Sequence, residues 1–185
     1  MLKALLRRQI AGFEKTWTYG ADYMRDLLDK GGPWTLIRFG LVASLGRGRA
    51  APAEALAAAG IVGTLSGDCG PCTQISVDMA VAAGVRPEVL RAVLAGDRLG
   101  MGEVAGLAHD FARAVLDRNL ADADECREEI ARRWGEAAVV DIALALTTAQ
   151  MYPTVKYALG HGRACTKVVV AGVSAPFRIP EPVTV

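Results

Sequence analysis

The sequence of 185 residues has almost no net charge and few aromatic side chains. Its 21 Lys and Arg residues balance 20 Asp and Glu residues to a formal net charge of +1, and aromatic residues make up 6% of the chain. The basic residues are spread along the sequence, whereas proteins that bind nucleic acid or anionic membranes usually concentrate them on one face. We therefore expect no nucleic-acid partner.

A hydrophobic run long enough to cross a bilayer is also missing. The most apolar segment, residues 137–151, is shorter than the ~20 residues that a transmembrane helix needs, and it contains Asp141. The N-terminal segment lacks the uninterrupted apolar stretch and the small-residue cleavage site of a secretory signal. These features predict a cytoplasmic protein without a membrane partner, in which residues 137–151 form a buried helix.

Motifs of several common enzyme classes are absent too. The sequence has no glycine-rich phosphate loop, no Ser–His–Asp triad and no paired-carboxylate motif, and it holds only two histidines, His109 and His161. A phosphate-binding loop needs closely spaced glycines at the start of a helix. We expect no cofactor.

The abundant residues indicate helices. Hydrophobic residues make up 52% of the chain, and they recur at spacings of three and four rather than in alternation, which favours an all-α protein. Glycine and proline divide this pattern into about eight helices. The expected ranges are about 6–27 (one helix, or two that meet at Gly20), 33–45, 52–65, 69–84, 87–96, 104–115, 122–134 and 136–153, with a kink or a further helix from Pro153 to about 166.

We interpret the chain as one domain, because its length suits a single core and no linker interrupts it. Four segments follow one another along it. They are N-terminal helices at 1–50, a core around the paired cysteines at 51–96, C-terminal helices at 97–168 and an extended tail at 169–185. Only residues 167–174, "KVVVAGVS", suggest a strand.

Cys69 and Cys72 stand two residues apart in the motif CGPC. Thioredoxins carry the same four letters after a β-strand, but here an Ala-rich helical pattern precedes the motif, which argues against that fold. Asp68 suits a helix N-cap and Pro71 suits a first helical turn. Because a helix N-terminus stabilises a thiolate, the motif predicts a redox-active pair, with two idle buried thiols as the alternative.

A helix that leads into C-x-x-C at the start of a second helix ending in "AAG" resembles the CxxC branch of the alkylhydroperoxidase D-like and carboxymuconolactone decarboxylase family, over residues 52–94. The resemblance implies an alkylhydroperoxidase D-like helical bundle with thiol-dependent peroxidase or disulfide oxidoreductase activity. It implies that Cys72 attacks the peroxide, that Cys69 resolves the product, and that a thiol or lipoyl-type reductant reopens the disulfide.

The resemblance also implies a homo-oligomer, a trimer or a multiple of trimers. The N-terminal segment carries more large apolar surface than one small helical core needs, which supports association. This surface includes Trp17, Tyr19, Tyr23 and Trp34.

The proton relay that is usual in this family is not visible in the sequence. Ser76 stands where the peroxidases have a histidine, one helical turn after the second cysteine, and Ala57 stands near the position of their glutamate. The nearest acid on the same helix is Glu54. Asp68 and His161 are the candidates to replace the missing base.

Three other interpretations remain open. The chain could be a non-catalytic helical binding or assembly protein on the same scaffold, or it could perform decarboxylase-like carbon chemistry in a pocket near Asp141. A carboxylate in an apolar helix needs a partner, and we favour an ion pair with an arginine for Asp141. The third is a tetrahedral zinc site of Cys69, Cys72, His161 and Cys165, the last two on one face of a predicted helix. We favour no metal, because that second pair lacks the usual close ligand spacing.

Overall fold

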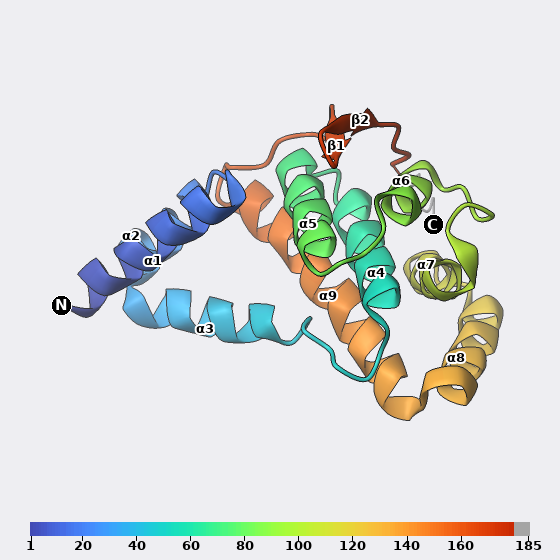
Figure 1. Cartoon of the computed structure of the whole chain (residues 1–185). Coiled ribbons are helices and arrows are strands. Elements are labelled where there is room, and N and C mark those ends of the chain that lie inside the picture. Colours follow the sequence, from blue (N-terminus) through green and yellow to red (C-terminus); the bar gives the residue numbers. More distant parts are fainter. Residues whose placement is uncertain (180–185) are drawn as a thin grey trace.

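The computed structural model describes residues 1–179. Within them the chain forms nine helices and one two-stranded antiparallel sheet, so the predicted all-α class is confirmed (Figure 1). The helices are α1 (Leu2–Trp17), α2 (Asp22–Gly31), α3 (Pro33–Ser44), α4 (Ala53–Ser66), α5 (Gly70–Ala82), α6 (Pro87–Ala95), α7 (Gly102–Leu116), α8 (Leu120–Trp134) and α9 (Glu136–Ala158); the strands are β1 (Val168–Val170) and β2 (Val173–Ala175).

Helix α4 lies at the centre of the body formed by α4–α9. It packs against α9 and α7, and α5 and α6 also contact it (Figure 1). Ala55, Ala58 and Ala59 are fully buried in these contacts. At Gly63 a Cβ atom would lie only 2.8 Å from the carbonyl oxygen of Leu146 on α9. The small residues of α4 therefore allow the close approach of two helix backbones.

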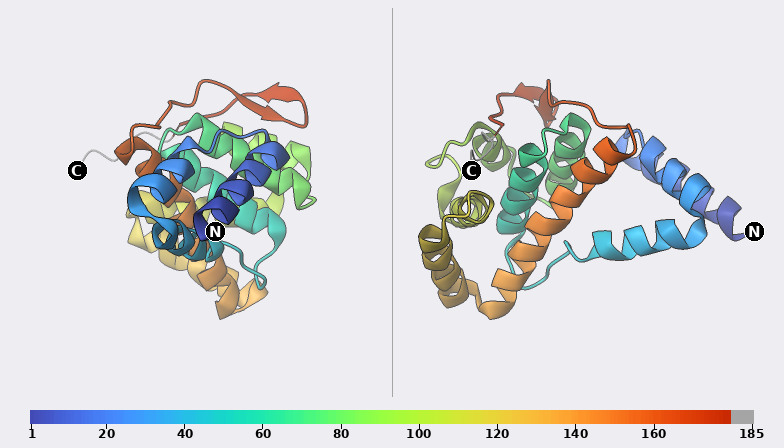
Figure 2. Two further views of the ribbon diagram at one scale, coloured as in Figure 1. Left: turned by 90° about the vertical axis from the view of Figure 1, so that its left-hand side faces the viewer. Right: turned by 180° about the vertical axis from the view of Figure 1, so that it is seen from behind.

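Helices α1, α2 and α3 form an arm that extends from one side of this body (Figures 1 and 2). The arm has a small core of its own, to which partly buried residues of α5 and α9 add. Its buried residues are Leu6, Ile10, Tyr19, Ala21, Tyr23, Leu28 and Leu36. The outer side of α3 stays uncovered, since Trp34 is 71% exposed and Leu41 64% exposed.

The first predicted helix is in fact two helices, one of the two forms that the sequence allowed. Helix α1 ends at Trp17, Thr18 has a left-handed backbone with φ 48°, and α2 begins at Asp22. The carboxylate of Glu14 holds this connection, because it accepts the backbone N–H of Ala21 at 2.9 Å and pairs with Arg25. Tyr19 therefore leaves the helical path and turns into the core of the arm.

Helix α9 continues past Pro153 but ends before residue 166, the limit that the sequence predicted. It runs for 23 residues through Pro153 and ends at Ala158, so neither a new helix at Pro153 nor helical structure up to residue 166 is present. By length and composition it is the one helix among residues 1–179 that could cross a membrane. It nevertheless packs against α4, α7 and α8, so it is a helix of the protein core here. The buried Pro153 fits beside Gly67, where a side chain would collide with the proline ring.

The C-terminal region differs from the predicted boundaries. Residues 159–167 have no helix, and residues 168–175 form a hairpin with Val168 opposite Ala175. The hairpin packs on α5 and α6, and Val168 and Val170 are fully buried. The predicted strand is thus confirmed, whereas the boundary between helices and an extended tail at residue 168 is wrong. The end of the predicted tail, residues 180–185, lies outside the described residues.

Candidate functional site

The paired cysteines lie at the start of α5 and are joined by a disulfide, with their Cα atoms 5.2 Å apart. The N-cap residue is Cys69 itself, so the prediction that Asp68 caps this helix is wrong. Asp68 has a left-handed backbone with φ 43°. Its carboxylate Oδ1 accepts the backbone N–H of Cys165 at 2.9 Å, and its carbonyl oxygen accepts the hydroxyl of Tyr157 at 2.9 Å. Asp68 therefore anchors the segment that follows α9.

That segment covers the Cys69 side of the motif. The backbone N–H of Gly70 donates to the carbonyl oxygen of Arg163 at 3.1 Å. A Cβ at Gly70 would lie 2.9 Å from the carbonyl oxygen of Ala164 and 3.1 Å from the Cα of Cys165. The glycine of CGPC is thus required by the close approach of the residues 163–165 backbone, which we call the strap. Cys69 is completely buried.

Gln74 fixes the next part of the chain to α5. Its side-chain amide donates to the carbonyl oxygen of Val169 at 2.9 Å, and its Oε1 accepts the N–H of Val169 at 2.8 Å. The side chain thereby pairs with β1 much as a neighbouring strand would. The sequence contains no signal for this role, because Gln74 looks like an ordinary residue of a first helical turn.

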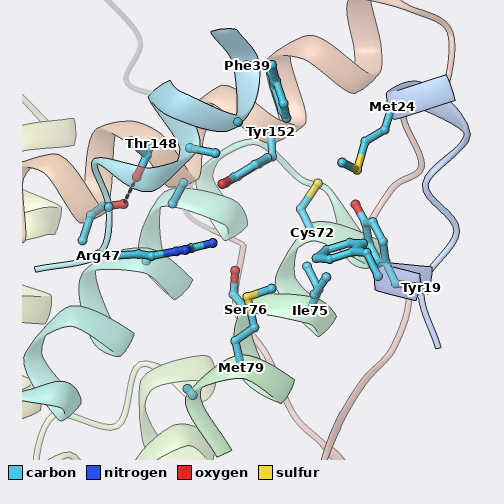
Figure 3. Close-up of a pocket in the computed structure, with 18 of the residues that line it drawn as sticks. Tyr19, Met24, Phe39, Arg47, Cys72, Ile75, Ser76, Met79, Thr148 and Tyr152 are labelled. Carbon is cyan, nitrogen blue, oxygen red and sulfur yellow. Dashed lines mark hydrogen bonds between the residues drawn. The ribbon is translucent and has the colours of Figure 1, made fainter. Parts of the chain in front are cut away.

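Cys72 lines a cavity of about 690 Å³ between the arm and the body. The walls come from α1–α3 on one side and from α4, α5 and α9 on the other, and they are mainly apolar. Figure 3 shows the Cys72 sulfur pointing into this space near Met24, Tyr19 and Tyr152. The two cysteines thus differ in their surroundings, since Cys69 is not among the lining residues.

The two positions that the resemblance assigns to a proton relay both line this cavity. They hold Ala57 on α4 and Ser76 on α5, neither of which can act as a base at neutral pH. Cys72 and Ser76 stand four residues apart on one face of the helix, and both face the same space (Figure 3). Residue 76 thus lies on the same side of α5 as Cys72, as their spacing predicts, and the role of Ser76 stays a prediction.

Three of the polar side chains that line the cavity are phenols. Tyr19, Tyr23 and Tyr152 take part in a chain of edge-to-face aromatic contacts that also includes Phe39, with centroid distances of 5.9–6.5 Å. Burial raises the pKa of all three phenols, for Tyr19 to about 12. Arg47 is the only lysine or arginine among the lining residues, and Figure 3 shows its guanidinium pointing into the cavity.

Lys156 lies directly behind these phenols. Its ammonium donates to the hydroxyl oxygen of Tyr19 at 3.0 Å and stands over the rings of Tyr19 and Tyr23, 4.8 and 5.4 Å from their centroids. The side chain is only 3% exposed. Burial, together with the charge of Arg163, lowers the pKa of Lys156 to about 8. In the sequence Lys156 lies near Pro153, where it could line a pocket or lie at the surface, and nothing there decides between the two.

The remaining predicted site residues are elsewhere. His161 lies beyond the end of α9, and its Nε2 is 2.9 Å from Oδ2 of Asp26. Glu54 pairs with Arg86 at 3.1 Å. Neither lines the cavity, so neither replaces the missing base at Cys72.

Asp141 also differs from the expectation. Its Oδ2 accepts the backbone N–H groups of residues 49, 50 and 51 at 2.8, 2.7 and 3.3 Å. The carboxylate is thus held by the loop before α4 rather than by an arginine side chain, and it does not line the cavity. Both the predicted ion pair and the predicted pocket acid are wrong.

The structure also contradicts the alternative zinc site of Cys69, Cys72, His161 and Cys165. His161 and Cys165 lie in an irregular segment and share no helix face. Among residues 1–179, no three His, Cys, Asp or Glu side chains are grouped as metal ligands would be.

We compared the chain with protein-family models, with curated proteins and with solved structures. None of them matches it. Membership of the alkylhydroperoxidase D-like family therefore stays a prediction from the sequence.

Proposed function

We propose that this protein is a thiol–disulfide oxidoreductase that reduces an apolar hydroperoxide, with Cys72 as the attacking thiol and Cys69 as the resolving thiol. The observation that carries this proposal is the asymmetry of the pair: Cys72 faces a large apolar cavity, and Cys69 is sealed beneath the strap yet within bonding distance of Cys72. Such chemistry suits the reducing cytoplasm, where a CxxC pair seldom serves as a permanent bridge.

The reaction begins with the thiolate of Cys72. It attacks one oxygen of the hydroperoxide, so that an S–O bond forms, the O–O bond breaks and the alcohol leaves after taking up one proton. The thiol of Cys69 then attacks the sulfenic acid of Cys72, which forms the disulfide and releases water. An external dithiol, of the lipoyl type, restores both thiols by exchange and is itself oxidised to a disulfide.

The position of Cys72 favours the thiolate. It is the third residue of α5, where backbone N–H groups have no partner within the helix. The N–H of Gly70 is bonded to the strap and Pro71 has no N–H, so the N–H of Cys72 and the helix dipole stabilise a negative charge on this sulfur. The proposal therefore does not depend on a base at residue 57 or 76 to generate the nucleophile.

The lining residues indicate the class of substrate. An apolar body would displace water from the walls of the cavity, which is favourable in proportion to the apolar area covered. Arg47, which forms no ion pair within residues 1–179, could neutralise a carboxylate at one end of such a molecule. We therefore propose an apolar hydroperoxide, with a carboxylate as its preferred polar group.

A second candidate is a non-catalytic protein that binds an apolar ligand in the same cavity. The observation that favours it is the lack of a titratable side chain at Ala57 and Ser76. Under this alternative the cavity would bind apolar molecules, but the thiols would not turn over.

Thiol titration before and after peroxide separates the two candidates. We expect cumene hydroperoxide to oxidise the reduced protein to the Cys69–Cys72 disulfide faster than hydrogen peroxide does, and dihydrolipoamide to restore both thiols. Cys72→Ser should abolish the reaction, Cys69→Ser should stop at a sulfenic acid that a 1,3-dicarbonyl reagent traps, and Cys126→Ser is the matched control. If peroxide forms no disulfide in the wild type while an apolar dye still binds, the binding protein is the correct description.

A further inference from the structure

Lys156 is a buried cation without an anionic partner. No carboxylate of residues 1–179 lies within 4 Å of its ammonium, although the same residues form many ion pairs elsewhere. The side chain comes from α9 and is 3% exposed. Burying an ammonium is costly, and a methionine of similar length would avoid this cost. Its position therefore suggests a role other than stability.

The groups around Lys156 come from several elements. Tyr19 and Tyr23, from the connection before α2 and from α2, contact it directly. Asp22 at the start of α2 attracts the ammonium from a greater distance, and Arg163 of the strap repels it. The two phenols in direct contact with Lys156 are neutral at physiological pH, so they carry no negative charge that would hold its proton.

Tyr19 connects this lysine with the cavity. Its hydroxyl oxygen accepts a hydrogen bond from Nζ of Lys156, so its own O–H hydrogen is directed elsewhere. The side chain lines the same cavity as Cys72, and Figure 3 shows both the hydroxyl and the sulfur facing that space. Among the three phenols that line the cavity, Tyr19 is thus the one whose hydroxyl oxygen is hydrogen-bonded to a cation.

We propose that Tyr19 is the proton donor of the site and that Lys156 is the positioning residue that holds Tyr19 and returns the proton to it. This inference rests on the proposed function. It assigns the missing relay to two residues 137 positions apart, at neither of the positions where the family carries it.

The proton balance of the cycle is complete. When the Cys72 thiolate forms its S–O bond, the departing alkoxide takes the hydroxyl proton of Tyr19, and the ammonium of Lys156 replaces that proton on the phenol. The resolving step releases water and needs no net proton. Reduction by an external dithiol then returns Cys69 to the thiol and Cys72 to the thiolate, and the proton left over recharges the amine of Lys156.

This role predicts a limb in the pH profile. The pKa of Lys156 near 8 means that the ammonium is present below this pH and is lost above it. The rate of peroxide reduction should therefore fall as the pH rises through about 8. Alkylation of Cys72 by iodoacetamide needs the thiolate but no proton donor, because iodide leaves unprotonated. The rate of alkylation should therefore not fall as the pH rises through about 8.

The experiment measures both reactions in single turnover on the reduced full-length protein. We expect Tyr19→Phe and Lys156→Met each to lower the rate with cumene hydroperoxide by about 10²-fold, within the range of general acid catalysis, and to remove the alkaline limb. The double variant should lose no more than either single variant, because the two residues act as one unit. Lys156→Arg keeps the charge but should also lose the limb, since a guanidinium does not release its proton.

Two controls make the result specific. Lys167→Met removes an exposed lysine and should leave both reactions unchanged. Alkylation of Cys72 should change by less than about threefold in all variants. Equal losses in the rates of alkylation and peroxide reduction would overturn the inference, because they would mean that Tyr19 and Lys156 only shape the site. Variants that keep the wild-type rate of peroxide reduction and its alkaline limb would overturn it as well.

The outcome for the proposed function is separate. A wild-type protein that peroxide does not oxidise refutes the oxidoreductase itself, whatever the variants do. If Lys156→Met does not fold, Tyr19→Phe, which keeps the buried ring, still decides the question.

Discussion

Replacing Lys156 by methionine should stabilise the protein, even though we expect the same change to lower its activity. The pKa of Lys156 falls from an ordinary value of 10.5 to about 8 on folding. At about 1.4 kcal/mol for each unit, the charged form of this lysine costs the folded state about 3 kcal/mol at neutral pH. The hydrogen bond to Tyr19 and the contacts with two aromatic rings favour the charged form and offset part of this cost.

The sign of the pH dependence follows from proton binding. Between pH 8 and 10.5 the unfolded chain holds a proton on Lys156 that the folded chain has released, so this group makes the free energy of unfolding rise with pH. Its penalty is complete below about pH 8 and is gone above about pH 10.5. Lys156→Met removes the penalty at every pH.

The assay is urea unfolding of wild type and variant at pH 7 and at pH 10, with the difference between the two proteins as the measured quantity. We expect the variant to be more stable by about 1–3 kcal/mol at pH 7, and this advantage to shrink by about 2 kcal/mol or more at pH 10. Other groups titrate equally in both proteins and cancel. A variant that is less stable at pH 7, or an advantage that does not change with pH, would refute the claim that Lys156 is a costly buried cation.

Four further changes test other parts of the structure. Gly70→Ala should push the strap away from α5 and lower the free energy of unfolding by about 1–3 kcal/mol, because the new Cβ would lie 2.9 Å from a backbone oxygen. Thermal unfolding measures this loss of stability, and an unchanged midpoint would contradict the close contact between Gly70 and the strap. Asp141→Asn should lower the free energy of unfolding by about 1–3 kcal/mol, since the carboxylate accepts three backbone N–H groups. It should leave the alkylation rate of Cys72 unchanged, and a large loss of that rate would indicate that Asp141 does act in the active site. Ser76→His should raise the rate of peroxide reduction, because residue 76 lines the cavity beside Cys72; a destabilised protein with no gain in rate would show that this position serves packing alone. Leu41→Glu on the uncovered side of α3 should dissociate a homo-oligomer, as light scattering would report, and a monomeric wild type at micromolar concentration would contradict the predicted association.

The aromatic residues of the arm divide between two roles. Tyr19 and Tyr23 are buried in the core of the arm, so they do not supply the surface for association that the sequence suggested. Trp34 does remain exposed, together with Leu41 on the same helix and Leu45 directly after it. The sequence could not separate these cases, because the turn at Thr18 decides which way Tyr19 points.

Much of the secondary structure was predictable because it depends on neighbours within a few residues. Apolar spacing located α4 and α7, Pro33 and Pro87 opened α3 and α6, and Gly96 ended α6 in a left-handed conformation. The start of α5 at the CGPC motif is of the same kind. Pro153 was the exception, since the space beside Gly67 lets the proline stay within a helix that its sequence would be expected to interrupt.

The sequence by itself determined an all-α chain with a thiol pair at a helix start and with residue 76 beside Cys72. Those features follow from helical periodicity, which acts over three or four residues. Only the tertiary structure decided that Cys72 faces a cavity while Cys69 lies under the strap, that Asp68, His161 and Asp141 hold the chain together elsewhere, and that Lys156 meets Tyr19. Such contacts join residues that are distant in sequence, and they depend on how the helices pack, which no local pattern encodes.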